Sequence, residues 1–253
     1  MIGIARPGRG GLGVGGMKRR RDDDDGENPR KPNDGRSDKE PAMAIEVESN
    51  FRPAEILIIG HSFVRRLLQY VNRSFGQFNN MRIEYSVAHV SCYSVAGATV
   101  DDILYNHLNA IDQYRPDIVY IAMGTNDLAA QDADPHMVGM LLENMAQQLV
   151  NLNVNQVIVG ETLFRTGRGI PSHAEDFNTR VIQMNHYLHN SMHNGTIPGA
   201  FHWHHIGLWN PQVQVLSRDG THLNRVGQHR YYRSVRGALL HAISRARHNG
   251  HLN

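Results

Sequence analysis

Cysteine, lysine and long apolar runs are the scarcest features of this 253-residue sequence. Its single cysteine, Cys92, excludes a disulfide within the chain and a structural zinc site built from several thiolates. No apolar run approaches the roughly 18 residues of a membrane span, and the N-terminus lacks the apolar core of a secretory signal. We therefore expect an intracellular, cytoplasmic protein without a membrane span.

Lysine occurs only at Lys18, Lys31 and Lys39, whereas all 16 histidines follow residue 60. The segment before residue 54 is rich in glycine, proline and charged residues. Such a composition cannot bury enough apolar surface to offset the entropy that a chain loses on ordering. The contrast predicts a disordered, low-complexity tail over residues 1–53 and a single folded domain over residues 54–253.

The expected tail carries a basic run, Lys18-Arg19-Arg20-Arg21, that could contact nucleic acid or serve as a nuclear address. A simply solvated run is the more common explanation. After residue 53 the chain has 15 arginines against 14 acidic residues, so the charges of the folded part nearly cancel. Any nucleic-acid partner is therefore expected at the tail, and the sequence does not indicate an oligomeric state.

From residue 54 onward, short apolar runs alternate with longer stretches of helical periodicity, which is typical of βαβ units. The expected strands cover residues 54–60, 82–89, 117–123, 156–161 and 200–206. The expected helices cover residues 62–71, 100–114, 135–152, 174–193 and 224–247. This order predicts an α/β fold, a three-layer α/β/α sandwich around a five-stranded parallel sheet.

Polar residues and glycine follow the expected strands where a parallel sheet binds its ligands, at the carboxyl ends. Ser62 follows the first strand, Gly97 the second and Asn126 the third, while Asp219 and His222 follow the fifth. A serine, an imidazole and a carboxylate together supply the nucleophile, the base and the orienting group of acyl transfer. Hydrolysis is therefore the leading interpretation.

Taken in order, four short motifs resemble the blocks of the SGNH (GDSL-type) hydrolase superfamily over residues 54–247. They are Ile58-Ile59-Gly60-His61-Ser62, Ser94-Val95-Ala96-Gly97-Ala98-Thr99, Gly124-Thr125-Asn126-Asp127 and Asp219-Gly220-Thr221-His222. The string from Gly60 to Leu67 also resembles SGNH domains carried by some invertebrate retroelements.

The resemblance implies a flavodoxin-like strand order and hydrolysis of small acyl or acetyl esters without a metal or other cofactor. Ser62 would then attack the ester, His222 would take its proton, and Asp219 would orient the imidazole. The oxyanion donors would be the backbone N–H groups of Ser62 and Gly97 and the side-chain amide of Asn126. The family usually carries an acidic residue before the serine, where this chain has His61.

Other interpretations of the same residues stay open. Ser62 and Asn126 are also common helix-cap residues. His202, His204 and His205 could ligate zinc, but no further ligand has a metal-site spacing, so a metal-free domain is preferred. The alternative to an esterase is a non-catalytic interaction module of the same fold, associated with nucleic acid through its basic tail.

Overall fold

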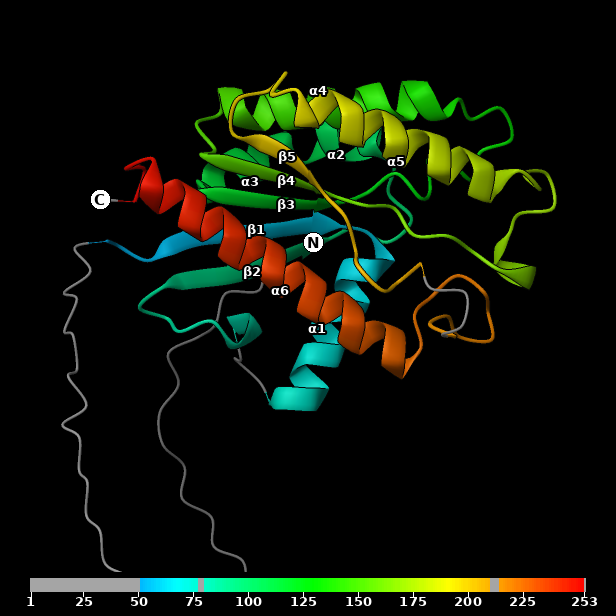
Figure 1. The fold of residues 1–253 in the computed structure, drawn as a ribbon, viewed down its shortest axis with the longest axis horizontal. Coiled ribbons are helices and arrows are strands. Elements are labelled where there is room, and N and C mark those ends of the chain that lie inside the picture. Colours follow the sequence, from blue (N-terminus) through cyan, green and yellow to red (C-terminus); the bar gives the residue numbers. More distant parts are fainter. Residues whose placement is uncertain (1–50, 77–79, 210–213, 253) are drawn as a thin grey trace, which may run out of the picture. The chain divides into compact units, whose positions relative to one another are not determined.

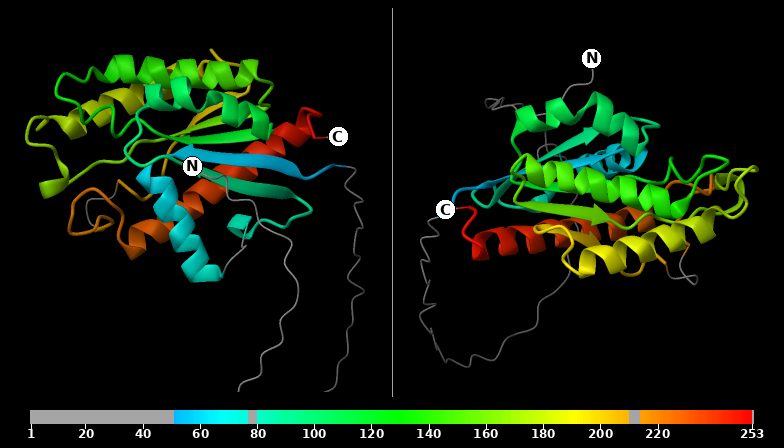
Figure 2. Two further views of the ribbon diagram at one scale, coloured as in Figure 1. Left: turned by 180° about the vertical axis from the view of Figure 1, so that it is seen from behind. Right: turned by 90° about the horizontal axis from the view of Figure 1, so that it is seen from above.

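The computed structural model describes residues 51–76, 80–209 and 214–252. The predicted tail, including its basic run, lies outside the described residues except for residues 51–53. The described part contains a five-stranded, all-parallel sheet between two layers of helices (Figures 1 and 2). The strand order β2-β1-β3-β4-β5 is the flavodoxin-like order, so the predicted fold class is confirmed. The strands are β1 (Ala54–Gly60), β2 (Ala88–Ser94), β3 (Ile118–Ala122), β4 (Gln156–Gly160) and β5 (Ala200–Trp203).

Each face of the sheet is covered by its own set of helices and its own apolar core. One face packs against α1 (Ser62–Phe75) and α6 (Arg225–His248). The opposite face packs against α2 (Val100–Asn106), α3 (Leu108–Tyr114), α4 (Pro135–Asn151) and α5 (Phe177–His193). Two short 3₁₀ helices complete the described elements, η1 (Asn80–Arg82) and η2 (Gly167–Gly169).

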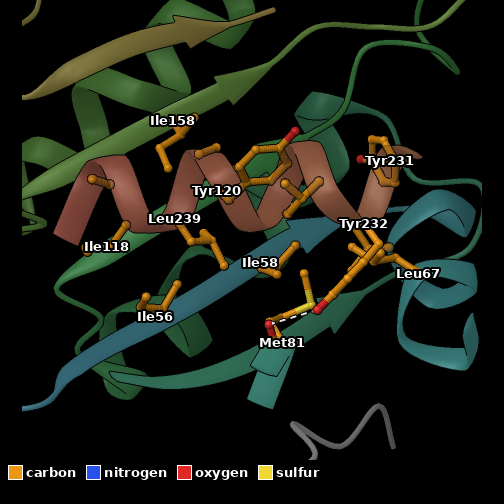
Figure 3. Close-up of a cluster of buried hydrophobic side chains, with 14 of the residues drawn as sticks. Ile56, Ile58, Leu67, Met81, Ile118, Tyr120, Ile158, Tyr231, Tyr232 and Leu239 are labelled. Atoms are coloured by element: carbon orange, nitrogen blue, oxygen red, sulfur yellow. Dashed lines mark hydrogen bonds between the residues drawn. The ribbon is translucent and has the colours of Figure 1, made fainter. Parts of the chain in front are cut away.

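The alternation of side chains along β1 explains how one strand supplies both cores. Ile56 and Ile58 point toward α1 and α6, whereas Leu57 and Ile59 point toward the opposite layer, and all four are 0% exposed. Figure 3 shows the first of these cores, in which Tyr120 of β3 lies among the isoleucines beneath α6. Burying each aliphatic side chain stabilises the fold by about 1.5–3 kcal/mol. A central strand with this pattern fixes the sheet between two helical layers.

The second strand was expected at residues 82–89, and this prediction is wrong, because β2 begins at Ala88. The preceding residues form turns, in which the amides of Val87 and Ala88 both donate to the Glu84 carbonyl. The buried amide of Asn80 donates to the carbonyls of Ile83 and Ala88 and stabilises the turn. Local hydrogen bonds thus satisfied backbone groups that the apolar pattern had assigned to the sheet.

Other boundaries differ by smaller amounts. The expected helix 100–114 is divided into α2 and α3 at His107, whose backbone leaves the helical region and whose Nδ1 lies 2.7 Å from the Tyr93 hydroxyl. The expected strand 200–206 ends at Trp203, since the next residues turn to contact Glu161. The expected helix 174–193 begins at Phe177, and the helix expected at 62–71 extends to Phe75.

The packed body includes residues that the sequence had placed in the tail. Phe51 packs against the core of the α1 and α6 face, and the Arg52 guanidinium bonds both carboxylate oxygens of Asp117 at 2.6 and 2.7 Å. The Arg52 amide also donates to the Leu252 carbonyl, which brings the first and last described segments side by side. No helix in the described ranges is long and apolar enough to cross a membrane.

Candidate active site

Ser62 is the first residue of α1 and lies directly beyond the carboxyl end of β1. The turn is tight because a Cβ at Gly60 would lie 2.7 Å from the Ala122 carbonyl oxygen and 2.5 Å from a Val64 methyl group. Glycine therefore lets β1, β3 and the start of α1 approach one another closely. The serine hydroxyl is left at the edge of the sheet, partly exposed.

The hydroxyl of Ser62 meets an imidazole from the far end of the chain. Ser62 Oγ lies 3.2 Å from His222 Nε2, and His222 Nδ1 lies 2.8 Å from Asp219 Oδ2. The other carboxylate oxygen, Oδ1, accepts the amides of Thr221 and His222, each at 2.9 Å. The structure thus brings together the three residues that the sequence predicted as nucleophile, base and orienting group.

The hydrogen bonds around Asp219 fix the tautomer of the imidazole. Partial burial raises the pKa of Asp219, but the amide and imidazole of His222 and the amide of Thr221 outweigh it and lower that pKa to about 2. An ionised carboxylate only accepts hydrogen bonds, so Nδ1 of His222 must donate. Nε2 of the neutral ring is then the acceptor that faces the Ser62 hydroxyl.

The loops that carry Gly97 and Asn126 are bonded to each other. Asn126 Nδ2 donates to the Ala98 carbonyl at 2.9 Å, and the carboxylate of the adjacent Asp127 accepts the Val100 amide at 2.9 Å. The amide nitrogen has two N–H donors, and only one of them has a partner in the part of the chain that the structure describes, so the other can bind a further acceptor. The pairing holds the loop after β3 against the loop after β2.

The backbone conformation at position 97 favours glycine. Among the described residues, no heavy atom would lie within 4 Å of a Cβ at this position, so crowding does not demand glycine there. The backbone has a φ of +76°, which side chains other than glycine adopt only at a cost. The Val95 amide donates to the Gly60 carbonyl at 2.9 Å and keeps this loop beside the end of β1.

His61 is buried behind the nucleophile, with 3% of the residue exposed. Burial, together with the nearby Arg165 and His222, lowers its pKa to about 4. Its Nδ1 has no hydrogen-bond partner within the described ranges, and the ring lies edge-on to Phe63, with the ring centres 5.6 Å apart. A cavity of about 20 Å³, wide enough for a single water molecule, lies beside it. The imidazole is therefore neutral at pH 7.

Arg165 is a residue of this region that sequence reasoning missed. It follows β4 by five residues, so the rule that applied to Ser62 and Asn126 at the strand ends also pointed to it. The residue is 9% exposed, and its guanidinium reaches both the carbonyl and the hydroxyl oxygen of Thr125 at 3.2 Å. It therefore contacts the segment that carries Asn126.

Two of the three histidines considered for zinc, His204 and His205, have other polar partners. His205 is 0% exposed and lies 3.1 Å from the Tyr120 hydroxyl and 2.8 Å from Ser234 Oγ. His204 pairs with Glu161 at 2.9 Å, while His202 lies against the ring of His189. In the described ranges, no three metal-ligating side chains are grouped so that they could hold an ion.

Comparison with known proteins identifies the family. The sequence signature of the GDSL-like lipase/acylhydrolase family matches residues 59–230, which is more than half of the chain and includes all four motifs except for Ile58. No curated protein is significantly similar in sequence.

Several solved structures have a similar fold at low sequence identity. A Bacteroides fragilis protein assigned to the acylhydrolases has a TM-score of 0.58 and 17% identity, with 76% of this chain and 91% of that chain covered. A GDSL-like lipase from Bacteroides thetaiotaomicron has a TM-score of 0.54 and 16% identity, covering 76% and 89%. An acetylxylan esterase from Geobacillus stearothermophilus has a TM-score of 0.52 and 14% identity, covering 76% and 95%. At such low identities, the solved structures show a shared fold and no more. The family signature matches the sequence of this chain directly and therefore shows its family. The chain therefore belongs to the GDSL-like lipase/acylhydrolase family and is a serine hydrolase of the SGNH (GDSL) type.

Proposed function

We propose that the protein hydrolyses acyl or acetyl esters, with Ser62 as nucleophile, His222 as general base and Asp219 as the residue that orients the base. The observation that carries this proposal is the unbroken series of contacts from Ser62 Oγ to His222 at 3.2 Å and from His222 to Asp219 at 2.8 Å. The catalytic unit is the packed body, from Phe51 to Leu252. The substrate is a small ester, and no step requires a metal.

The reaction proceeds in two acyl transfers. Nε2 of His222 accepts the Ser62 proton as Oγ attacks the ester carbonyl carbon, and a tetrahedral intermediate forms. Collapse of this intermediate breaks the bond to the alcohol, which leaves with the proton from His222. Water then attacks the acyl-serine with His222 again as base, and the acid is released as Ser62 recovers its proton. Asp219 stabilises the imidazolium in both halves and keeps its own charge.

Negative charge on the carbonyl oxygen is stabilised by three donors: the backbone amides of Ser62 and Gly97 and the side chain of Asn126. The Ser62 amide belongs to the first turn of α1, where backbone N–H groups have no partner within the helix. The N-cap residue, His61, makes no side-chain hydrogen bond to this turn, and the helix dipole favours negative charge there. Each such donor is worth about 3 kcal/mol in the transition state.

Hydrolysis of p-nitrophenyl acetate by the purified full chain tests the proposal. We expect turnover by the wild type and none by Ser62→Ala, because the nucleophile is removed. Ser74→Ala is the matched control, since Ser74 is exposed at the other end of the same helix. A fluorophosphonate should label Ser62, as identified by mass spectrometry of the peptides.

Two results would contradict the proposal. Undiminished turnover by Ser62→Ala would place the chemistry elsewhere. Neither turnover nor labelling of the wild type would favour the non-catalytic interaction module.

A further inference from the structure

Arg165 joins the loop after β4 to the loop that carries Asn126. Its Nη2 donates to the carbonyl and hydroxyl oxygens of Thr125, each at 3.2 Å. Thr125 precedes Asn126, so the Thr125 carbonyl and the backbone N–H of Asn126 belong to the same peptide unit. The guanidinium thus fixes the backbone from which the predicted oxyanion donor extends.

The loop after β4, which carries Arg165, also contacts the Asp219–His222 segment. The Thr166 amide donates to the Gly220 carbonyl at 2.8 Å, and the Gly169 amide donates to the Thr166 carbonyl at 2.9 Å. A Cβ on either Gly169 or Gly220 would overlap the backbone of the facing segment, so the backbones of the two segments are in direct contact. Arg165 Nη1 lies 3.5 Å from the Gly169 carbonyl and extends this network inward.

Arg165 is unusual because its charge is buried without a counter-ion. Among the described residues no carboxylate lies within salt-bridge distance of it, and its Nε has no hydrogen-bond partner. The guanidinium lies 4.5 Å from the centre of the Phe177 ring, and the Arg165 backbone is bonded to the side chain of Asn178. Burial lowers the pKa of Arg165, which reflects the cost of keeping this charge away from water. Stability alone does not account for a cation in this place.

We propose that Arg165 is a positioning residue, which holds the Thr125–Asn126 segment and the Asp219–His222 segment at the separation that catalysis requires. The inference rests on the proposed function, since it assigns a task to a residue outside the triad. Displacement of a reacting group by about 1 Å costs about 100-fold in rate. Loss of the guanidinium should therefore act on kcat and leave KM nearly unchanged.

The experiment compares Arg165→Ala and Arg165→Lys with Arg180→Ala in the full chain. Arg180 is a matched control because its side chain is 12% exposed and donates to the carbonyls of Leu128, Ala130 and Gln131, downstream of Asn126. Unlike Arg165, it pairs with a carboxylate, that of Asp176, at 2.9 Å. We expect Arg165→Ala to lower kcat for p-nitrophenyl acetate about 100-fold with KM within about twofold of wild type. Arg165→Lys should recover part of this loss, and Arg180→Ala should keep the wild-type kcat.

Chemical rescue with guanidinium ion distinguishes loss of the Arg165 side chain from general destabilisation, because added guanidinium does not restore the kcat of a variant that is only less stable. Guanidinium ion at concentrations far below those that unfold the protein should raise the kcat of Arg165→Ala and not that of Arg180→Ala. A kcat for Arg165→Ala equal to that of Arg180→Ala would overturn the proposal.

A wild type with neither turnover nor fluorophosphonate labelling would refute the proposed function and leave this inference to a second measurement. Hydrogen exchange of the Thr166 amide reports the contact between the loops without catalysis, since it donates to the Gly220 carbonyl, and exchange of the His222 amide reports order within the Asp219–His222 segment, since it donates to Asp219. Both amides should exchange faster in Arg165→Ala than in Arg180→Ala. Equal protection in the two variants would overturn the inference.

Discussion

Replacement of His61 by glutamine should make the fold less sensitive to acid. His61 is 3% exposed, and its pKa is lowered to about 4 by burial and by the neighbouring Arg165 and His222. None of the residues that the structure describes forms a hydrogen bond with its Nδ1. The folded protein therefore keeps this imidazole neutral in a range where the unfolded chain protonates it. Glutamine fills similar space and does not titrate.

The sign and size of the effect follow from the two protonation equilibria. An unfolded histidine takes up a proton below a pH of about 6.5, so the unfolded state binds more protons and stability falls as the pH drops. The stabilising contribution is complete above a pH of about 6.5 and is lost as the pH falls toward the folded pKa of about 4. Between pH 7 and pH 5, His61 alone should remove about 2 kcal/mol from the free energy of unfolding.

Urea denaturation at pH 7 and pH 5 measures this contribution. The free energy of unfolding of the wild type should fall by about 2 kcal/mol more than that of His61→Gln over this interval. The comparison is made within each protein, so any packing defect of the variant cancels. His248→Gln, at the exposed end of α6, should keep the wild-type dependence on pH. Equal losses in wild type and His61→Gln would refute the assignment of a buried neutral imidazole behind Ser62.

Two further predictions concern the site loops. Asn126→Ala should lower kcat about 100-fold at nearly constant KM, since one oxyanion donor is worth about 3 kcal/mol, and an unchanged kcat in steady-state assays would exclude this role. Gly220→Ala should lower the free energy of unfolding by about 2–5 kcal/mol, because the new methyl group would overlap the Thr166 carbonyl at a φ of +69°. Gly97→Ala, with a similar φ but open space around it, should cost only about 1–2 kcal/mol, and equal losses of the two variants in urea would contradict the contact between the loops.

The sequence was sufficient for the fold class and for the candidate residues that follow strands. A strand that is buried on both faces of a parallel sheet, such as residues 56–59, is a continuous apolar run. Such a run can be recognised in the sequence. Ser62, Asn126 and the Asp219–His222 pair were recognisable because their types and order are informative before any contact is known. Their convergence is seen in the structure, while their catalytic roles stay predictions.

What the sequence did not predict depends on contacts between distant residues. β2 was misplaced because the Asn80 amide, several residues away, stabilises a turn where an apolar alternation suggested a strand. Arg165 was overlooked because an isolated arginine is usually solvated. Its proposed role depends on burial beside Phe177 and on hydrogen bonds to Thr125. Neither contact can be predicted from the residues next to Arg165 in the sequence.

The last helix has a consequence for the synthesis of the protein. α6 lies against α1, with the rings of Tyr232 and Phe75 5.0 Å apart, and Ser62 meets an imidazole that is 160 residues later in the chain. A nascent chain that has completed the sheet but not α6 leaves the apolar surface of Ile56, Ile58 and Tyr120 open to water. Such an intermediate is prone to aggregation and is a natural client for chaperones. The proposed role of Ser62 therefore requires that the segment with His222 has folded onto the sheet.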